Sequence, residues 1–300
     1  MATGESIVRR QSECAVVLSG LDSLRTTKIM ESLLVERLER KCRRVLELWE
    51  RAERNWNQVL FVMSAYAMGA PRNGAQFEEL AARVNYLTCL KERSSQQRVE
   101  ALLLGVSGLL TKEFFDDYIV TMQEEYDYLA EKYSLESMNP GVWDRRALMP
   151  ASNPVLRVVQ LAALVTKECY SMDSLLALRS VEEIERMFSV APSEYWAKRF
   201  LAGDEGSMAT GRIGRDKVYM LAINLVVPVQ MAYAGVMGDV TLRERALELL
   251  EGIPAEHNRL VSAWTGYGVG CHSAYDSQAL IELSTRCREQ RCAECPLAHK

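Results

Sequence analysis

The stretch that decides the fold is VYMLAINLVVPVQMAYAGVM, residues Val218–Met237, in which twenty consecutive residues carry no charge. On length alone, such a stretch can cross a bilayer as a helix. Asn224, Pro228 and Gln230 interrupt it, no comparable second stretch exists in the sequence, and its flanks give no clear topology signal. We therefore expect no membrane span but a central helix, kinked at Pro228 and buried in the core.

Helical periodicity continues outward from this stretch along the chain. From about Ile29, apolar residues recur every three or four positions, which predicts one long amphipathic helix or two helices with a break near Asn55. Another apolar helix is expected over residues 155–167, and the sequence shows no alternation typical of strands. We predict an all-α, multi-helix globular bundle of roughly ten helices, with a buried central apolar helix and a C-terminal cysteine loop.

Composition and patterning divide the chain into three expected parts. Apolar residues make up 48% and charged residues 25% of the 300 residues, which is typical of soluble globular proteins. Residues 1–25 are polar and weakly patterned, so we expect a weakly structured N-terminal arm there. A helical domain is expected over residues 26–272, and residues 273–300 are predicted to form a final helix and a cysteine-rich metal-binding tail.

The charge pattern limits the possible partners. A net charge of −4 provides no global attraction to nucleic acid or to an anionic membrane, so nucleic-acid binding requires a local basic patch. The candidate patch, here called the basic stripe, consists of Arg37, Arg40, Lys41, Arg44 and Arg51. We favour a solvated face balanced by Glu36, Glu39 and Glu47 over a phosphate-binding face.

Cysteine usage indicates a reducing compartment. Eight cysteines in 300 residues are too sparse for a secreted disulfide scaffold. The sequence also shows no recognisable export signal. We therefore expect a cytoplasmic protein.

Three of these cysteines form the strongest chemical motif in the chain. The spacing is Cys-x4-Cys-x2-Cys-Pro, over Cys287, Cys292 and Cys295. A two-residue gap lets two thiolates bind one metal from a tight turn, while the third reaches in from the end of the preceding helix. Neighbouring arginines favour the thiolate form that metals require. The candidates for the fourth ligand are His299, Cys271, His272 and Cys14.

Two metal centres fit this motif. Zinc is the simpler interpretation, with His299 as fourth ligand. An iron–sulfur cluster is the alternative, because Cys-x2-Cys-Pro after a helix is typical of cluster-binding loops. Residues 279–297, ALIELSTRCREQRCAECPL, resemble the cluster loop of helix-hairpin-helix DNA glycosylases, whose pattern is Cys-x6-Cys-x2-Cys-x5-Cys. The shorter first gap here, and the lack of a recognisable glycosylase hairpin, argue against glycosylase activity.

One polar pair stands out on the apolar helix expected at residues 155–167. Arg157 and Gln160 lie one helical turn apart among apolar residues. A buried arginine needs a carboxylate or carbonyl partner. The pair is therefore either a structural clamp, which we favour, or part of a site.

Taken in order, the motifs of the chain resemble a bacterial family known only as domain of unknown function 2851. The similar stretches include VERLERK, NWNQVLFVMSAYAMGAPRNGAQFEELA, VEALLLGVSGLL, NPVLRVVQLAAL, INLVVPVQMAYA, ALELLEGIPAEHN, SAYDSQALIEL and CREQRCAEC. The resemblance implies the helical C-terminal two-thirds of a family member. In such members a region rich in strands and histidines precedes it, so we expect a separate N-terminal domain or another protein partner.

The resemblance also implies which residues occupy family motif positions. The polar ones proposed as a candidate pocket are Glu100, Arg157, Gln160, Asn224, Asp276 and Gln278. Cys14 falls near a cysteine that typically precedes the first long helix of the family. The resemblance therefore favours Cys14 as the fourth ligand beside Cys287, Cys292 and Cys295, joining the two ends of the fold.

Three functional hypotheses follow from the sequence. The first, which we favour, is a helical binding or scaffold protein whose tail cysteines hold a structural zinc ion or iron–sulfur cluster. The second is a nucleic-acid-binding or DNA-processing protein with a glycosylase-like cluster loop, which the acidic balance disfavours. The third is an enzyme that uses the candidate polar pocket, although the sequence shows no recognised nucleophile–base pair.

Overall fold

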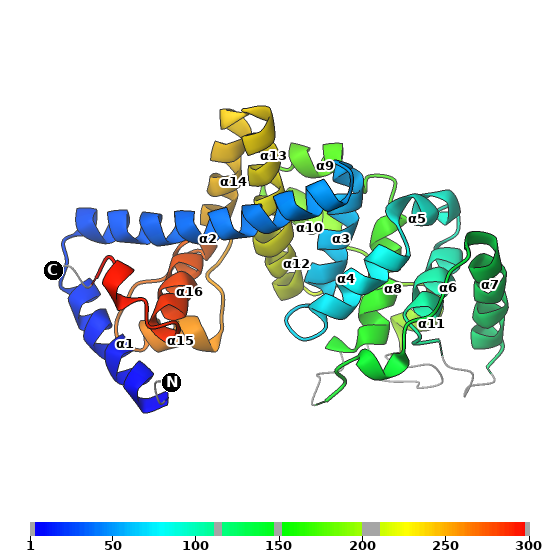
Figure 1. The fold of residues 1–300 in the computed structure, drawn as a ribbon, viewed down its shortest axis with the longest axis horizontal. Helices are drawn as coiled ribbons and strands as arrows, with labels where there is room; N and C mark the ends of the chain where they lie inside the picture. The colour runs from blue at the N-terminus through cyan, green and yellow to red at the C-terminus, as the bar shows by residue number, and fades with distance from the viewer. Residues whose placement is uncertain (1–3, 111–115, 147–151, 200–210, 298–300) are drawn as a thin grey trace. The chain divides into compact units, whose positions relative to one another are not determined.

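The structure of the chain is a computed structural model, which describes residues 4–110, 116–146, 152–199 and 211–297 (Figure 1). Within these ranges the regular secondary structure is helical, and the only strand-like pairing is one isolated bridge between Pro254 and Ser273. The predicted all-α fold is confirmed. The helices outnumber the roughly ten expected, because short ones such as α9 (Met172–Ala177) and α11 (Glu194–Ala197) contain too few turns to show periodicity.

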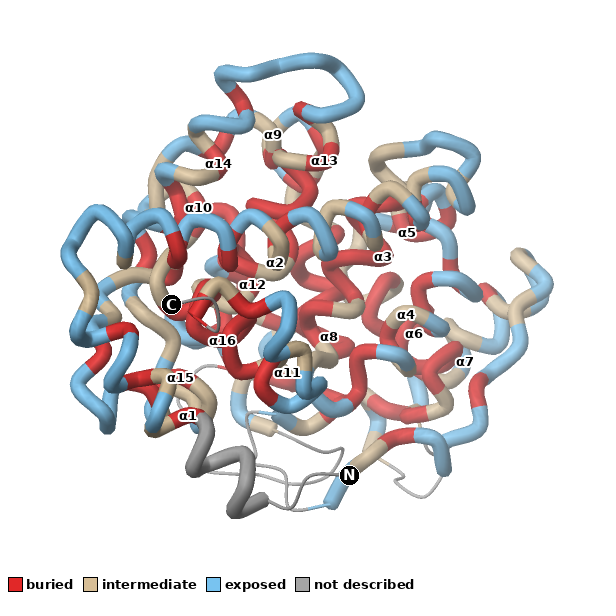
Figure 2. The backbone as a smooth tube through the Cα atoms, turned by 60° about the vertical axis from the view of Figure 1, so that its left-hand side comes forward, coloured by how far each residue is buried: buried red, intermediate tan, exposed pale blue. Residues whose placement is uncertain are grey.

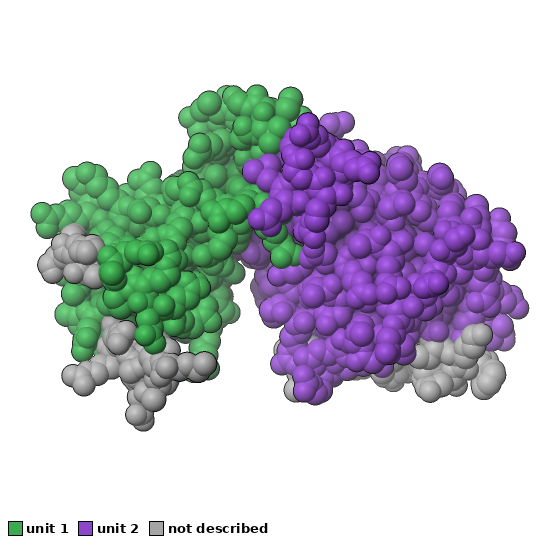
Figure 3. Space-filling model, in the orientation of Figure 1, with its two compact units in different colours: residues 1–44, 230–300 green, residues 45–229 purple. Residues whose placement is uncertain are grey.

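The chain forms two compact units (Figure 3). Unit 1 consists of residues 1–44 and 230–300, and unit 2 of residues 45–229. Helices α2 (Ser23–Arg51) and α13 (Val227–Met237) contain the points where the chain passes from one unit to the other. This division differs from the expected helical domain over residues 26–272 and separate tail over residues 273–300. The tail belongs to a unit built from both segments that flank unit 2.

The remaining elements fall within single units. Unit 1 contains α1 (Gly4–Ser19), α14 (Val240–Gly252), α15 (Arg259–Thr265), α16 (Ala274–Arg288) and the 3-10 turn η4 (Cys292–Glu294). Unit 2 contains α3 (Trp56–Gly69), α4 (Gly74–Arg83), α5 (Tyr86–Glu92), α6 (Gln96–Val106), α7 (Asp117–Tyr133), η1 (Pro140–Val142), α8 (Pro154–Val165), α9, α10 (Val181–Phe188), α11, α12 (Arg215–Leu221) and η3 (Ala222–Val226).

Helix α1 occupies most of the N-terminal stretch that was expected to be a weakly structured arm. Its apolar stripe is narrow, but Ala15 and Leu18 are buried in unit 1. The helix packs against α15 and α16, which lie more than two hundred residues later in the sequence. A helix stabilised by such distant partners carries little local signal of its own.

The uncharged apolar stretch at residues 218–237 is helical throughout and consists of α12, η3 and α13. Buried residues dominate it (Figure 2), and 61% of its most apolar window is buried inside the protein. Within the described ranges, Arg215–Met237 is the one helix whose length and composition would allow it to cross a membrane. The π-helical turn η3 lies immediately before Pro228, which has no N–H to donate to the Asn224 carbonyl.

Unit 2 is built around α3, α6 and α8, with α4 and α7 packed against them. Gly105 of α6 lies so close to α7 that a Cβ atom there would overlap the ring of Tyr126. Gly108 has a φ of +69°, and a Cβ there would overlap the Met138 carbonyl. Gly105 thus permits the close contact between α6 and α7 that its apolar setting predicts, whereas Gly108 permits a close approach to the loop after α7.

The core of unit 1 contains a polar seam between α2 and α16. Arg37 Nε and Lys41 Nζ each donate to Gln278 Oε1 at 2.6 Å. Arg40 forms a two-pronged ion pair with Glu282, whose side chain is fully buried. The prediction that the basic stripe is a solvated face is therefore wrong for Arg37 and Lys41, because α16 covers them.

Candidate metal centre

One cavity in unit 1, about 190 Å³ in volume, is lined by Glu13, Cys14, Arg286, Cys287, Arg291, Cys292 and Cys295. Cys14 comes from α1, Cys287 from the last turn of α16, and Cys292 and Cys295 from the start and end of η4. Cys287 and Cys295 are buried, while Cys292 is exposed. The fold thus brings the three tail cysteines and Cys14 around a common space.

The chain after α16 turns sharply to present the tail cysteines. Gln290 adopts a left-handed φ of 58°, and the Arg291 N–H donates back to the Arg286 carbonyl at 3.0 Å, which ends the helix. The turn η4 follows, in which the Cys295 N–H donates to the Cys292 carbonyl at 3.1 Å. Residues three apart lie on the same side of such a turn, so both thiols are directed to one cavity.

Helix α2 holds the two arginines of this cavity. Glu36 forms ion pairs with Arg286 and with Arg291, the latter at 3.2 Å. Arg286 Nη1 donates to the Glu294 carbonyl at 2.6 Å, and Arg291 pairs with the Glu294 carboxylate at 2.8 Å. The Nε of Arg286 is buried and has no hydrogen-bond partner among the described residues. Because buried donors are normally satisfied, this N–H suits an acceptor inside the cavity.

The cysteines interact with one another electrostatically. The hydrogen bond with Cys14 raises the pKa of Cys287, and burial and the charges of Cys14, Cys295 and Cys292 raise it further. Burial is the main cause of the raised pKa of Cys295, and its neighbours Cys14 and Cys292 add to it. Without a cation between them these thiols hold their protons, so a metal would displace protons on binding.

The two expected metal centres require different arrangements of the four thiols. Within the described part of the chain, no three His, Cys, Asp or Glu side chains are placed to hold a metal ion. A single zinc ion requires every thiolate at about 2.3 Å from one point. An iron–sulfur cluster spreads its four thiolates over different irons, so the ligands surround a volume. The four cysteines line one cavity of about 190 Å³.

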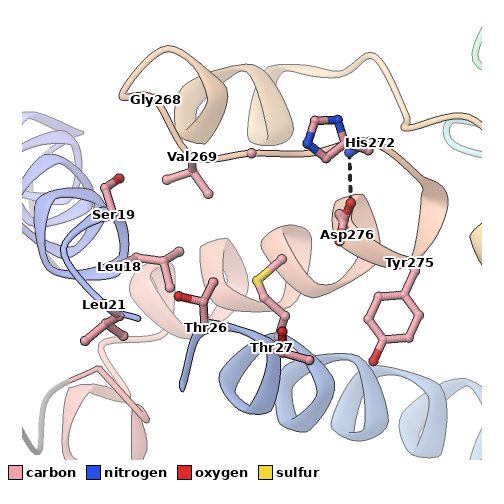
Figure 4. A pocket seen from close by; sticks show the side chains of 12 residues that line it. Leu18, Ser19, Leu21, Thr26, Thr27, Gly268, Val269, His272, Tyr275 and Asp276 are labelled. Atoms are coloured by element: carbon pink, nitrogen blue, oxygen red, sulfur yellow. Dashed lines mark hydrogen bonds between the residues drawn. The ribbon is translucent and has the colours of Figure 1, made fainter. Parts of the chain in front are cut away.

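The other ligand candidates lie elsewhere or outside the described residues. His299 belongs to residues 298–300, which the structure does not describe. His272 lines a different cavity of unit 1, about 350 Å³ in volume, together with Tyr275 and Asp276 (Figure 4). Burial raises the pKa of Cys271 to about 11. Among the three candidates that the structure describes, Cys14 is the one that shares a cavity with the tail cysteines.

Asp276 and Gln278 of the candidate polar pocket belong to unit 1. Asp276 forms the predicted capping box with Ser273, and its carboxylate also accepts the His272 N–H at 2.8 Å (Figure 4). Gln278 accepts from Arg37 and Lys41, as described above, and its amide donates to Glu256. Burial lowers the pKa of Lys41 to about 7, with Arg37 adding to the effect. Both residues thus hold α16 in place.

Glu100 lies in unit 2, where four uncharged groups donate hydrogen bonds to its carboxylate. Its carboxylate accepts from the Ser193 N–H at 2.8 Å, the Ser193 hydroxyl at 2.7 Å, Tyr118 at 3.0 Å and Gln96 at 3.0 Å. Its pKa is raised, because burial outweighs these hydrogen bonds. These hydrogen bonds connect α6, α7 and the start of α11, so we assign Glu100 a role in holding these helices together.

Arg157, Gln160 and Asn224 occupy two further places in unit 2. Arg157 Nη1 donates to Gln160 Oε1 at 2.8 Å, and Gln160 Nε2 donates to the Gly211 carbonyl at 2.7 Å. The side chain of Asn224 donates within its own helix, to the Met220 carbonyl at 3.0 Å. The six polar residues are thus distributed over separate networks.

Sequence reasoning missed two residues that the structure makes prominent. Lys217 is buried beside Arg157, yet in the sequence it is only the charge that precedes the apolar stretch. Glu36 holds Arg286 and Arg291, yet in the sequence it is one of many glutamates on α2. Neither carries a local signal, because its partner lies far along the chain.

The described part of the chain is thus a helical fold of two units, and in unit 1 Cys14 and the three tail cysteines line one cavity. The chain matches the family described as "Protein of unknown function (DUF2851)" over residues 4–259, and it belongs to that family. The match includes Cys14 and ends before the three tail cysteines. Comparisons with curated proteins and with solved structures returned no match.

Proposed function

We propose that this protein is a helical binding or scaffold domain in which Cys14, Cys287, Cys292 and Cys295 hold an iron–sulfur cluster. The observation that carries the proposal is the meeting of Cys14, from α1, with the three tail cysteines around one cavity. The four positions come from two segments of the chain, α1 and the stretch from the last turn of α16 to the end of η4. A bound cluster would join both segments of unit 1.

The surroundings of the cavity support a cluster with a negative total charge. Four thiolates bring four negative charges, and the two arginines of the wall, Arg286 and Arg291, offset part of this charge. The buried Nε of Arg286, which has no hydrogen-bond partner among the described residues, would be available to a sulfur acceptor. Hydrogen bonds of this kind tune the properties of iron–sulfur centres.

The role we assign to the centre is structural. When bound, an iron–sulfur cluster supplies four rigid bonds and one redox-active centre. In this chain Cys14 would hold α1, Cys287 would hold the end of α16, and Cys292 and Cys295 would hold the turn η4. The residues of unit 1 thereby keep the α1–α15–α16 packing intact.

Anaerobic purification with iron, sulfide and zinc analysis tests this proposal. We expect brown protein with a broad absorption at about 400 nm and about four irons per chain. The Cys14→Ser variant is expected to lose the colour, whereas Cys169→Ser, an exposed cysteine of unit 2, is expected to keep it. Removing the metal from the unchanged protein should lower its Tm, and removal should not lower that of Cys14→Ser further.

Two outcomes would contradict the proposal at different levels. One zinc ion per chain, lost in Cys14→Ser, would replace the cluster by a single ion and leave the four-cysteine centre in place. Protein that contains neither metal, together with an unchanged Tm for Cys292→Ser, would remove the metal centre altogether.

A further inference from the structure

A second cavity, about 350 Å³ in volume, lies in unit 2 near the end of α3 and the start of α12. Its described lining includes three cationic side chains, Arg72, Arg157 and Lys217, and one carboxylate, Asp216. Arg157 and Lys217 form its inner wall, since Arg72 and Asp216 are exposed. The cavity has the size of a small-molecule site and carries two net positive charges.

Arg157 lacks the partner that a buried arginine requires. It is half-buried on α8, and its one side-chain hydrogen bond among the described residues goes from Nη1 to the neutral Gln160 side chain at 2.8 Å. No described carboxylate forms an ion pair with it. Burial lowers the pKa of Arg157 to about 10. The rest of its guanidinium edge remains available to an acceptor.

Lys217, which lines the same cavity, also lacks a carboxylate partner among the described residues. It is 7% exposed, and its Nζ donates to the Ala67 carbonyl at 2.6 Å and to the Ala70 carbonyl at 3.2 Å. A protonated lysine has three donors, so one remains after these two bonds. No described carboxylate forms an ion pair with Lys217.

The contrast with unit 1 shows how unusual this arrangement is. There the largely buried Arg37 and Arg286 both meet carboxylates, those of Glu282 and Glu36. Buried charges are normally paired, because desolvation without a counter-charge is unfavourable. Arg157 and Lys217 instead repel each other across one cavity, which lowers the Lys217 pKa beyond the effect of burial.

We infer that this cavity binds a small ligand with a phosphate monoester group, held between Arg157 and Lys217. Two net positive charges match a phosphate dianion better than a single carboxylate. A guanidinium edge and a lysine point charge are the usual pair of phosphate-binding groups. The glutamine that fixes Arg157 acts as a positioning residue, since Gln160 is itself held by the Gly211 carbonyl.

Calorimetric titration of the full chain in phosphate-free cationic buffer tests the inference. The probes are inorganic phosphate, glucose 6-phosphate as a monoester, and acetate and citrate as carboxylates. We expect saturable binding of the monoester and weaker or no binding of the carboxylates. Free phosphate that binds as tightly as the monoester would identify the phosphate group alone as the ligand chemistry.

Substitutions assign the binding to this cavity. Arg157→Met and Lys217→Met should each weaken monoester binding about tenfold to a hundredfold, as expected for the loss of a charge-assisted hydrogen bond. Arg157→Lys, which keeps the charge but loses the fork, should fall between Arg157→Met and the unchanged protein. Arg215→Met is the matched control, because Arg215 lies two residues from Lys217 and has a side chain that is 72% exposed.

The pH dependence gives an independent readout. Above about pH 7 the monoester is fully dianionic, whereas Lys217 has a pKa of about 7 and loses its proton. Arg157 from α8, Arg72 from the loop after α3 and Asp216 from α12 also face this cavity. Loss of the Lys217 charge should weaken monoester binding from pH 7 to pH 9, and Lys217→Met should not show this part of the decline.

Three results would overturn the inference. The first is no saturable binding of either phosphate probe by the unchanged protein at millimolar concentration. The second is unchanged monoester binding by a folded Arg157→Met variant, with folding checked by circular dichroism. The third is tighter binding of citrate or acetate than of the monoester, which would assign the cavity to carboxylates.

Discussion

Replacing Lys217 by methionine should remove a defined part of the pH dependence of stability in unit 2. Burial, with Arg157 adding to it, lowers the pKa of this lysine from its ordinary value of 10.5 to about 7. Methionine has a similar length, so it fills the same space without a charge. The substitution therefore isolates the ionisation of one buried group.

The magnitude follows from the two pKa values. Between pH 7 and pH 10.5 the unfolded chain binds a proton at this lysine that the folded chain does not bind, so stability rises with pH. From pH 7 to pH 9 the contribution of Lys217 to the free energy of unfolding increases by about 2 kcal/mol. Methionine also leaves the Ala67 and Ala70 carbonyls without this donor, but that loss does not change with pH.

Urea unfolding at pH 7 and pH 9, followed by tryptophan fluorescence, measures this effect. Four of the five tryptophans, Trp49, Trp56, Trp143 and Trp196, lie in unit 2, so the signal reports mainly on that unit. The buffers should be cationic, to avoid anions that enter the cavity. Lys28→Met, at an exposed position of α2, is the control for loss of a lysine charge.

The quantity to compare is the change in the free energy of unfolding from pH 7 to pH 9, in each variant and in the unchanged protein. We expect the gain in stability from pH 7 to pH 9 to be about 2 kcal/mol smaller in Lys217→Met than in the unchanged protein. Lys28→Met should retain the full gain. An equal gain in Lys217→Met and the unchanged protein would show that Lys217 is charged in the folded state throughout this range, and the reasoning would fail.

Four further substitutions test the packing, each by urea or thermal unfolding with circular dichroism. Gly105→Ala should destabilise the protein by roughly 1–3 kcal/mol because its Cβ overlaps Tyr126. Gly235→Ala, with no atom within 4 Å of the added Cβ, should stabilise it by roughly 0.5–1 kcal/mol, and equal effects of the two would contradict this account. Glu282→Gln should cost roughly 3 kcal/mol by leaving Arg37 and Arg40 without their carboxylate, and a neutral result would show that the polar seam is dispensable. Trp264→Phe should cost roughly 1–3 kcal/mol, since the buried Ser284 hydroxyl loses its 2.7 Å bond to the indole, and Ser284→Ala in the same background should then cost little more.

Local signals in the sequence were sufficient for many helix boundaries. Asn55 marks the predicted break after α2, because its side chain accepts from Asn57 N–H and Gln58 N–H at the start of α3. The predicted capping box of Ser273 and Asp276 starts α16. Residues 241–244, TLRE, also have the sequence of a capping box, but Asp239 caps α14 and that helix begins at Val240. Competing caps two residues apart cannot be ranked by type alone.

The candidate metal centre shows where sequence reasoning stops. The tail spacing identifies Cys287, Cys292 and Cys295, because tight-turn ligands are neighbours in the chain. Cys14 is 273 residues before Cys287 and has no local link to it, so only a family resemblance pointed to it. The same holds for Arg157 and Lys217, whose shared cavity depends on how α8 and α12 pack.

Unit 1 is built from two segments of the chain, residues 1–44 and 230–300, and this affects the order in which the protein can fold during synthesis on the ribosome. Unit 2 is one continuous segment and can fold as soon as residue 229 has emerged, whereas α1 must wait for α15 and α16. At about 5–20 residues per second, Cys287 is made roughly 15–55 s after Cys14. During that interval the first thiol has none of its partners. Assembly of the four-cysteine cavity therefore follows the synthesis of the whole of unit 2.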